Sequence, residues 1–123
     1  MKIVHTSNAP EAIGPYSQAI LAGGLVFTSG QIAINPATGA VEAATIEEQT
    51  EQVCQNITAV LEAAGSSIDR VVKTTCFLQS MEDFAAFNAV YGKYFTGKPA
   101  RSCVAVKTLP KNVLVEVDTI AEQ

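Results

Sequence analysis

The order in which strand and helix patterns follow one another restricts the fold of this chain more than any other feature of its sequence. Apolar, β-branched stretches typical of strands alternate with two stretches of helical spacing, in the order β-β-α-β-α-β-β. The strands are expected at residues 16–22, 25–31, 71–79, 102–108 and 113–121. Because each strand–helix–strand connection returns the chain to the same direction, at least three strands are expected to run parallel.

Local signals mark the helices and the first turn. Two glycines at 23–24 predict a tight hairpin between the first two strands. Thr45 and Glu48 have the spacing of a capping box, and Gly65 suits the position just beyond the end of the helix that they begin. Ser80 is expected to cap the second helix, whose aromatic stripe is typical of a side that faces the core. The stripe consists of Phe84, Phe87, Tyr91 and Phe95.

Two helices cannot cover both faces of the expected sheet. Five or six strands make a sheet about 24–29 Å wide, whereas two adjacent helices cover about 20 Å. The helices therefore shield one face, although the segments 71–78, 102–106 and 113–117 carry apolar residues on both faces. A soluble monomer avoids so large an exposed apolar patch, so we expect an oligomer that buries the second face.

Length and charge limit the class of protein. The chain has 123 residues and a mass of 12.9 kDa, which allows a single domain over residues 1–123. A net charge of −4 without any basic run disfavours nucleic acid as a partner. No segment approaches the ~20 apolar residues that span a bilayer, and the N-terminus lacks a signal-peptide pattern. We therefore expect no membrane partner and a cytoplasmic location.

Cysteine and histidine are too few and too scattered for a metal site. The three cysteines, Cys54, Cys76 and Cys103, are widely spaced, and His5 is the only histidine. A disulfide framework and a Cys/His zinc site are both unexpected, and Cys54 and Cys76 are interpreted as small core residues. Motifs for phosphate, dinucleotide, zinc-protease and serine-hydrolase sites are missing as well.

Two charged residues stand beside apolar strand segments. Arg101 precedes one such segment, and Glu116 lies inside the sequence Val-Leu-Val-Glu-Val at 113–117. An ionised group in an apolar strand is costly unless it is paired or hydrogen-bonded. From the residues alone two interpretations stay open. Arg101 and Glu116 form a structural ion pair, or Arg101 awaits an anionic ligand while Glu116 acts as an acid–base group.

Five short motifs, spread over nearly the whole chain, resemble those of one known family. They are Ile-Gly-Pro-Tyr-Ser-Gln-Ala at 13–19, Phe-Thr-Ser-Gly-Gln at 27–31, Pro-Ala-Arg-Ser-Cys-Val at 99–104, Leu-Pro-Lys at 109–111 and Val-Leu-Val-Glu-Val at 113–117. Because it carries these five motifs in this order, the chain is similar to the Rid family, also called the YjgF family. It most resembles the RidA-type branch, whose members hydrolyse reactive 2-imino acids and their enamine tautomers to 2-keto acids and ammonia.

The resemblance implies a fold and an assembly. The fold is the chorismate-mutase-like α+β fold, a mixed sheet with two helices on one face, in a homotrimer whose sheets face inward. Spacing alone favours a hairpin between 102–108 and 113–121. The resemblance instead implies that 113–121 is inserted between 25–31 and 71–79, and we adopt that order.

The resemblance also implies a site in the clefts between adjacent subunits. Arg101 matches the arginine that binds the substrate carboxylate, and Glu116 matches the acid that positions or activates water. The matching pocket residues are Tyr16, Ser29, Asn88 and Cys103. Plainer roles stay open for these four: interface packing for Tyr16, a turn for Ser29, backbone capping for Asn88, and a backbone N–H rather than a thiolate for Cys103.

The activity that the resemblance implies is that of a 2-iminobutanoate/2-iminopropanoate deaminase, a metabolite damage-control enzyme that needs no cofactor and no metal. One alternative is a non-catalytic binding module or regulator for 2-keto acids or other small carboxylates on the same scaffold. The other is the protein-quality or RNA-related activity ascribed to some family members. Glu116 distinguishes the deaminase from the first alternative, because a pocket that only binds a carboxylate gains nothing from a second carboxylate.

Overall fold

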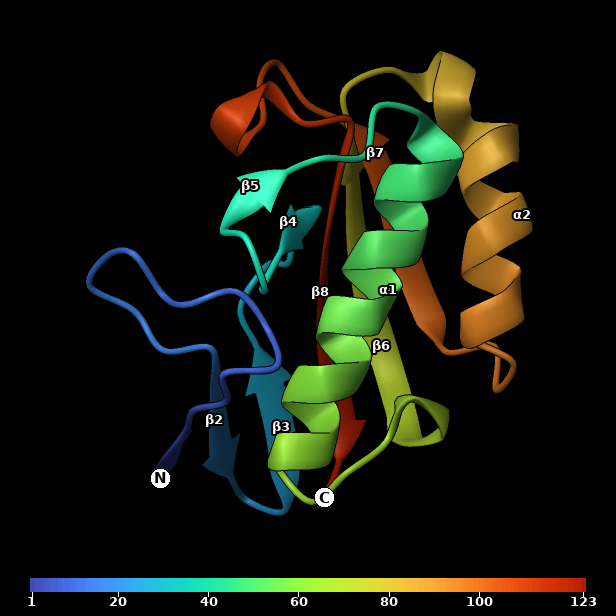
Figure 1. Ribbon diagram of the computed structural model, residues 1–123. Coiled ribbons are helices and arrows are strands. Elements are labelled where there is room, and N and C mark those ends of the chain that lie inside the picture. Colours follow the sequence, from blue (N-terminus) through green and yellow to red (C-terminus); the bar gives the residue numbers. More distant parts are fainter.

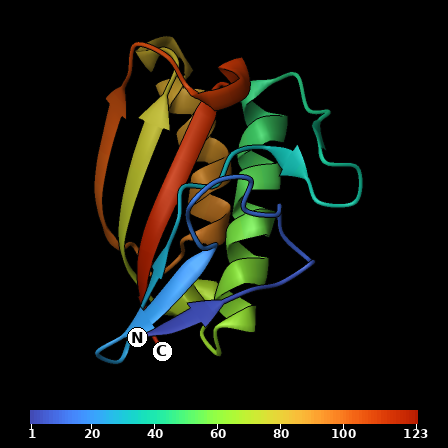
Figure 2. The same cartoon turned by 90° about the vertical axis from the view of Figure 1, so that its left-hand side faces the viewer.

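Two helices lie side by side on one face of a six-stranded mixed sheet in the computed structural model, which describes all residues, 1–123 (Figures 1 and 2). The helices are α1 (Ile46–Ala63) and α2 (Phe84–Tyr94). The strands of the sheet are β1 (Lys2–Val4), β2 (Ala19–Ala22), β3 (Leu25–Thr28), β6 (Val71–Leu78), β7 (Ala100–Ala105) and β8 (Val115–Glu122). This is the expected α+β architecture.

The strand order is β1-β2-β3-β8-β6-β7. The last strand, β8, lies between β3 and β6 and is antiparallel to both, so the hairpin that spacing favoured is not formed and the inserted order is confirmed. β6 and β7 form the only parallel pair. Because β8 separates β3 from β6, these two strands and β7 all run in the same direction, as the two crossovers predict.

Several boundaries differ from the sequence predictions. β2 begins at Ala19 rather than at residue 16, because the Gln18 side chain turns inward and bonds to the backbone of the preceding loop. β7 runs from Ala100 to Ala105, whereas 102–108 was predicted. β8 runs from Val115 to Glu122, within two residues of the predicted limits 113–121. A short hairpin, β4 (Ile34–Asn35) and β5 (Ala40–Val41), was not predicted.

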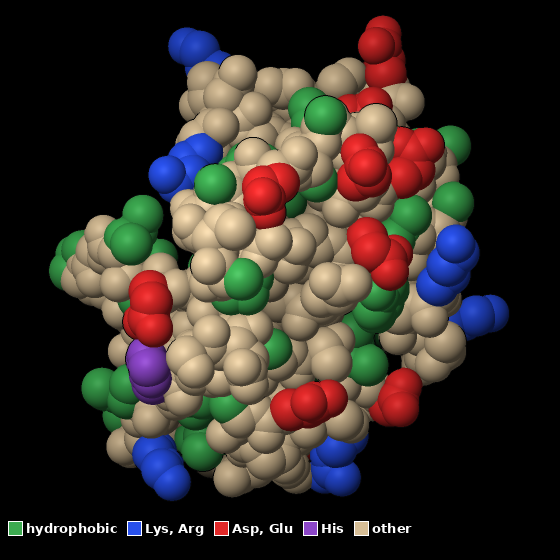
Figure 3. Space-filling model, in the orientation of Figure 1, with side chains coloured by type: hydrophobic (Ala, Val, Ile, Leu, Met, Phe, Trp, Pro, Cys, Tyr) green, Lys and Arg blue, Asp and Glu red, His purple; other side chains and the backbone are tan.

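The helix signals are confirmed at α1 and partly confirmed at α2. Thr45 and Glu48 form the predicted capping box, and Gly65 has a φ of 79°, a left-handed conformation that glycine adopts without strain. Ser80 caps a 3-10 turn (Met81–Asp83) that leads into α2, rather than α2 itself. The acidic residues of α1 that lie off its apolar stripe, such as Glu47 and Glu62, are exposed, and Figure 3 shows acidic side chains spread over this helical side.

The core lies between the helices and the sheet. Val53, Ile57 and Leu61 of α1 are buried against Val115 and Val117 of β8 and their neighbours. Cys54 and Cys76 belong to this core, as expected. Burial raises the pKa of the Cys76 thiol to about 12.

The opposite face of the sheet, which we call the open face, is covered by no helix of the chain. Large apolar side chains are exposed there: Ile3 (62%), Phe27 (40%) and Val104 (49%). Strand pairing places Ile120 beside Phe27, and Phe77 beside Val104, on the same face. The expected uncovered apolar face is therefore present. No helix of the structure has the length and apolar character needed to cross a membrane.

Candidate active site

Glu116 projects from the open face of the sheet. Its neighbours Val115 and Val117 on β8 point into the core, so the alternation of the strand turns the Glu116 side chain the other way. The chain beyond β3 pairs again with β8 through a bridge between Gln31 and Val117. This bridge brings Gly30 against the Glu116 carboxyl group, where a Cβ atom would overlap Oε2.

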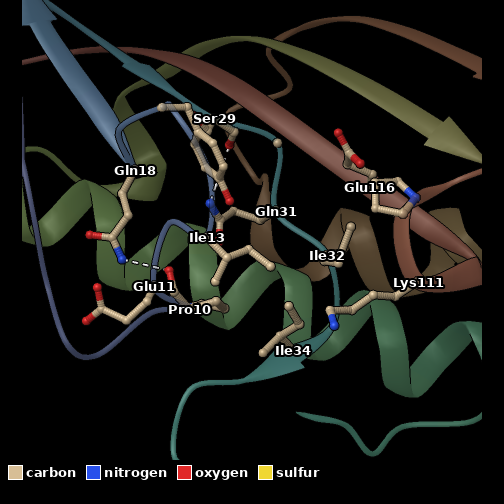
Figure 4. A pocket seen from close by; sticks show the side chains of 13 residues that line it. Pro10, Glu11, Ile13, Gln18, Ser29, Gln31, Ile32, Ile34, Lys111 and Glu116 are labelled. Carbon is tan, nitrogen blue, oxygen red and sulfur yellow. Dashed lines mark hydrogen bonds between the residues drawn. The ribbon is translucent and has the colours of Figure 1, made fainter. Parts of the chain in front are cut away.

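A cavity of about 480 Å³ opens beside this carboxyl group (Figure 4). We call it the Glu116 cavity. Its walls come from the loop before β2, from the segment that follows β3 and from the turn at Pro110–Asn112. Tyr16 and Ser29 line it together with Glu116, so the structure brings these three predicted site residues together. Its volume is within the range of ordinary small-molecule sites.

One buried side chain holds the loop that forms a wall of the cavity. Gln18, 3% exposed, donates from Nε2 to the carbonyl oxygens of Thr6 (3.0 Å) and Pro10 (2.8 Å), and its Oε1 accepts from the Thr6 amide (2.8 Å). Ser29 Oγ donates to the carbonyl of Ser17 at 2.6 Å. Ser29 therefore ties the loop to the end of β3, whichever further role it has.

The protein environment disfavours the charged form of Glu116. Burial raises the pKa of its carboxyl group, and the negative charge of Asp118, two residues along β8, raises it further. No cation lies within ion-pair distance, because the one ion pair of the structure joins His5 to Glu11. A carboxyl group in this setting is suited to exchanging protons with a ligand or with water.

Arg101 occupies the other face of the sheet. It lies on the edge strand β7, and its Nη1 donates to Asn88 Oδ1 of α2 at 2.7 Å. The guanidinium carbon lies 5.4 Å from the centroid of the Phe84 ring and 4.9 Å from that of Tyr91. Arg101 has no carboxylate partner, so most of its N–H donors are available to an anionic ligand.

Cys103 lies two residues beyond Arg101, on the same face of β7, and pairs in register with Cys76. Burial raises the pKa of the Cys103 thiol, and the positive charge of Arg101 offsets part of this effect. The thiol form is favoured, in agreement with the expectation that Cys103 is not a thiolate. We call Arg101, Asn88 and Cys103 the Arg101 cluster.

The predicted site residues thus form two groups on opposite faces of the sheet. Glu116 lies on the open face, whereas the Arg101 cluster lies on the face that bears the helices. The structural ion pair between Arg101 and Glu116, which the sequence left open, does not exist within one chain. No group of three or more His, Cys, Asp or Glu side chains has the arrangement needed to hold a metal ion.

The chain is similar to known proteins over almost its whole length. The family model described as Endoribonuclease L-PSP matches residues 6–123. A Lactococcus lactis protein, named as a candidate regulator, AldR, is 54% identical over 99% of this chain and 98% of its own. The 2-iminobutanoate/2-iminopropanoate deaminase of Salmonella typhimurium is 48% identical over 98% of this chain and 96% of its own. The chain belongs to the Rid (YjgF) family. Among solved Rid-like structures, that of E. coli TdcF with bound serine is 42% identical and superposes with a TM-score of 0.95. The match covers 100% of this chain and 99% of the TdcF chain.

Sequence reasoning missed several residues of this Rid protein that shape the Glu116 cavity. Gly30 and Gln18 act through steric space and through backbone hydrogen bonds, which no composition pattern reveals. Lys111 lines the cavity from the Leu-Pro-Lys motif at 109–111, to which no role in the site was assigned. Phe84 and Tyr91 were predicted as core residues, and they also form the aromatic floor beneath Arg101. Gln18, Gly30 and Lys111 all lie inside motifs that carry the family resemblance, and this membership is the signal that could have found them.

Proposed function

We propose that this Rid protein is an enamine/imine deaminase that hydrolyses reactive 2-imino acids to 2-keto acids and ammonia, a damage-control reaction in the cytoplasm. The observation that carries the proposal is the state of Glu116. It is a half-buried carboxyl group with a raised pKa and no cationic partner, and it faces a cavity. The deaminase named above, 48% identical, supports the same substrate class.

The reaction adds water across the C2=N bond and expels ammonia. A protonated imine carbon is already electrophilic, so water needs only to be positioned and deprotonated. Glu116 accepts a proton as the water oxygen bonds to C2, and it then returns this proton to the nitrogen. The C–N bond breaks as the hydroxyl oxygen forms the C=O bond of the 2-keto acid, and the departing ammonia takes the hydroxyl proton and leaves as ammonium. Positioned acid–base help of this kind is worth about 10²–10⁴-fold in rate.

In this proposal Arg101 holds the substrate carboxylate. Its planar fork suits a two-point contact, and Asn88 and the aromatic rings below fix the guanidinium group. Because Arg101 and Glu116 lie on opposite faces of one chain, we propose that each site combines the Arg101 cluster of one subunit with the Glu116 cavity of the next. The assembly is a homotrimer of chorismate-mutase-like subunits, with open faces turned inward.

The remaining predicted residues position the substrate. We assign Tyr16 to the wall beside the reacting carbon, since it lines the Glu116 cavity and is 52% exposed within the single chain. Ser29 keeps that wall in place through its bond to Ser17. The backbone N–H of Cys103 is proposed to add a donor to the carboxylate held by Arg101.

A second candidate is a non-catalytic regulator that binds small carboxylates. The Lactococcus lactis relative is named as a candidate regulator, and TdcF was solved with bound serine, an amino acid of the size that such a pocket would take. Glu116 counts against this candidate, because its charge repels a bound carboxylate. Ribonuclease activity, which the name of the family model carries, is disfavoured by the net charge of −4.

The test is ammonia release from 2-imino acids generated in situ. The wild-type protein is expected to accelerate release, and Arg101→Ala to abolish it while the oligomer stays folded. Arg101→Lys is expected to be severely impaired as well, because lysine keeps the charge but loses the fork. Arg70→Ala is the matched control, since Arg70 is the only other arginine and bonds to the backbone near the C-terminus. Binding of a 2-keto acid without any ammonia release would favour the regulator.

A further inference from the structure

The loop between α2 and β7 holds a lysine in an unfavourable backbone conformation. Lys98 has a φ of 52°, in the left-handed region that glycine favours, although its neighbour Gly97 has no positive φ. A lysine there costs conformational free energy, and a residue before a proline, as Lys98 is before Pro99, is normally extended. Residues held in such conformations gather at functional sites. The strain at Lys98 therefore calls for a role that its side chain supplies.

The Lys98 side chain does not hold this loop in place. The Lys98 amide donates to the carbonyl oxygen of Phe95 at 3.2 Å, and Thr96 Oγ1 donates to Asp69 Oδ1 at 3.5 Å. Asp69 is the acidic residue in contact with the loop, and it forms no ion pair with Lys98. The loop is thus fixed by its backbone and by Thr96, which leaves the ammonium group of Lys98 free for another role.

That ammonium group lies on the same groove as the Arg101 guanidinium. Lys98 and Arg101 line this groove together with the rings of Tyr91 and Phe95, and we call it the Lys98 groove. No acidic residue lines it, and neither cation has a carboxylate partner. The chain as a whole has a net charge of −4 and repels an anion. Lys98 therefore makes the surroundings of Arg101 locally positive on an acidic protein.

We propose that Lys98 is an electrostatic steering residue, which attracts the carboxylate of an approaching substrate toward Arg101. This inference rests on the proposed function, in which Arg101 holds that carboxylate. Lys98 acts from a distance, because the two-point contact belongs to Arg101, and it changes how readily the carboxylate arrives and stays. Salt screens such an exposed charge, since the Debye length falls from about 30 Å at 0.01 M ionic strength to about 3 Å at 1 M. The contribution of Lys98 therefore disappears at high salt.

The test measures imine hydrolysis at ionic strengths of about 0.01 M and about 1 M. The 2-imino acid of methionine is generated in situ by an amino-acid oxidase, and each variant's kcat/KM is divided by the wild-type value at the same salt concentration, so that effects of salt on the oxidase cancel. Lys98→Met removes the charge, Lys98→Glu reverses it and Lys98→Arg keeps it. Lys93→Glu is the matched control, because Lys93 is exposed in the last turn of α2 and lies outside the groove.

At low salt, Lys98→Met is expected to lower kcat/KM about two- to threefold and Lys98→Glu about four- to tenfold, as for charges several ångströms apart in water. The loss is expected in KM, with kcat unchanged, and it is expected to vanish at high salt. Lys98→Arg and Lys93→Glu are expected to stay near the wild-type value. A loss that persists at high salt, an equal loss in Lys93→Glu or dissociation of the oligomer would overturn the steering role.

Lys98→Gly separates the charge from the backbone strain. Glycine adopts the left-handed conformation without strain, so we expect a higher Tm than in the wild type, while kcat/KM at low salt falls as in Lys98→Met. A lowered Tm would make Lys98 a structural residue and overturn the inference.

Calorimetric titration with 2-oxobutanoate at both salt concentrations distinguishes this inference from the proposed function. If no imine is hydrolysed, but the affinity for 2-oxobutanoate depends on Lys98 at low salt and not at high salt, the proposed function fails and the steering role holds. An affinity that is independent of Lys98 at both salt concentrations would overturn the steering role, whether or not imines are hydrolysed.

Discussion

At the scale of single residues, the chemistry of this Rid protein depends on how its fold treats the Glu116 carboxyl group. Glu116→Gln keeps the size of the side chain but cannot accept a proton at neutral pH. We expect kcat for imine hydrolysis to fall by about 10²-fold or more, while affinity for a 2-keto acid is kept or rises because a negative charge is removed. Steady-state ammonia release and calorimetric titration on the same sample check both effects. Normal turnover with weakened binding would make Glu116 a structural residue.

The same substitution has an expected effect on stability. The folded-state pKa of Glu116 is raised above its ordinary value. Its contribution to the free energy of unfolding is therefore full at acid pH and is lost as pH rises through the raised pKa. At neutral pH the ionised group destabilises the fold, so Glu116→Gln is expected to unfold at a higher temperature than the wild type. The difference should shrink when the thermal scans are repeated at acid pH.

Asp118 is expected to control the pH at which Glu116 works. Its negative charge raises the pKa of Glu116, and Glu116 must be ionised to take a proton from water. Activity therefore falls as pH drops through the pKa of Glu116. Asp118→Asn removes that charge and is expected to move the acid limb of the kcat/KM profile to lower pH. Asp83→Asn, at the start of α2, changes the net charge equally and should leave the limb in place. An unmoved limb in Asp118→Asn would exclude this coupling.

At the scale of elements, the loop before β2 forms a wall of the Glu116 cavity, and the hydrogen bonds of the Gln18 side chain hold this loop in place. Gln18→Leu keeps the volume and removes every hydrogen bond of the side chain. Partly buried backbone groups of Thr6 and Pro10 then lack partners, which costs about 1–3 kcal/mol, or roughly 4 °C in Tm for each kcal/mol. We expect KM to rise more than kcat falls, because the cavity wall loosens. Gln55→Leu, an exposed position on α1, is the control, and equal effects from both variants would contradict the role of the loop.

Elements whose signals are local could be predicted from the sequence. The capping box of α1 needs only Thr45 and Glu48, and the buried alternation of β8 already separates Val115 and Val117 from Glu116. The β4–β5 hairpin could not be found, because strands of two residues have no periodicity.

The face that Arg101 takes was equally hidden. β7 places Arg101 toward the helices and the apolar Val104 on the open face, against the usual order of polarity. Its orientation follows from contacts with α2, more than ten residues away along the chain. The residues of the site were thus predicted one by one through the motifs. Their division between two faces required the structure.

At the scale of the whole molecule, two features of the chain call for a partner. The open face exposes Ile3, Phe27 and Val104, and β7, which carries Arg101, is an edge strand whose outer side is unpaired. Natural proteins cover or block such edges. A ring of three subunits uses two different surfaces of each chain at every interface. Such a ring is the simplest way to bring the Arg101 cluster of one subunit toward the Glu116 cavity of the next.

Mixing two inactive variants tests this shared site. Arg101→Ala and Glu116→Gln chains are co-expressed with different tags, and mixed trimers are isolated through both tags and sized by light scattering. An interface is intact when one subunit supplies Arg101 and the next supplies Glu116, which every mixed trimer, with two chains of one variant and one of the other, achieves at about one site in three. We expect ammonia release to return to about that fraction of the wild-type rate, whereas each variant alone stays at background. Co-expression of two differently tagged Arg101→Ala chains is the control. Mixed trimers without recovered activity would show that no site is shared between subunits. A monomer of 12.9 kDa in the wild-type sample would contradict the proposed trimer itself.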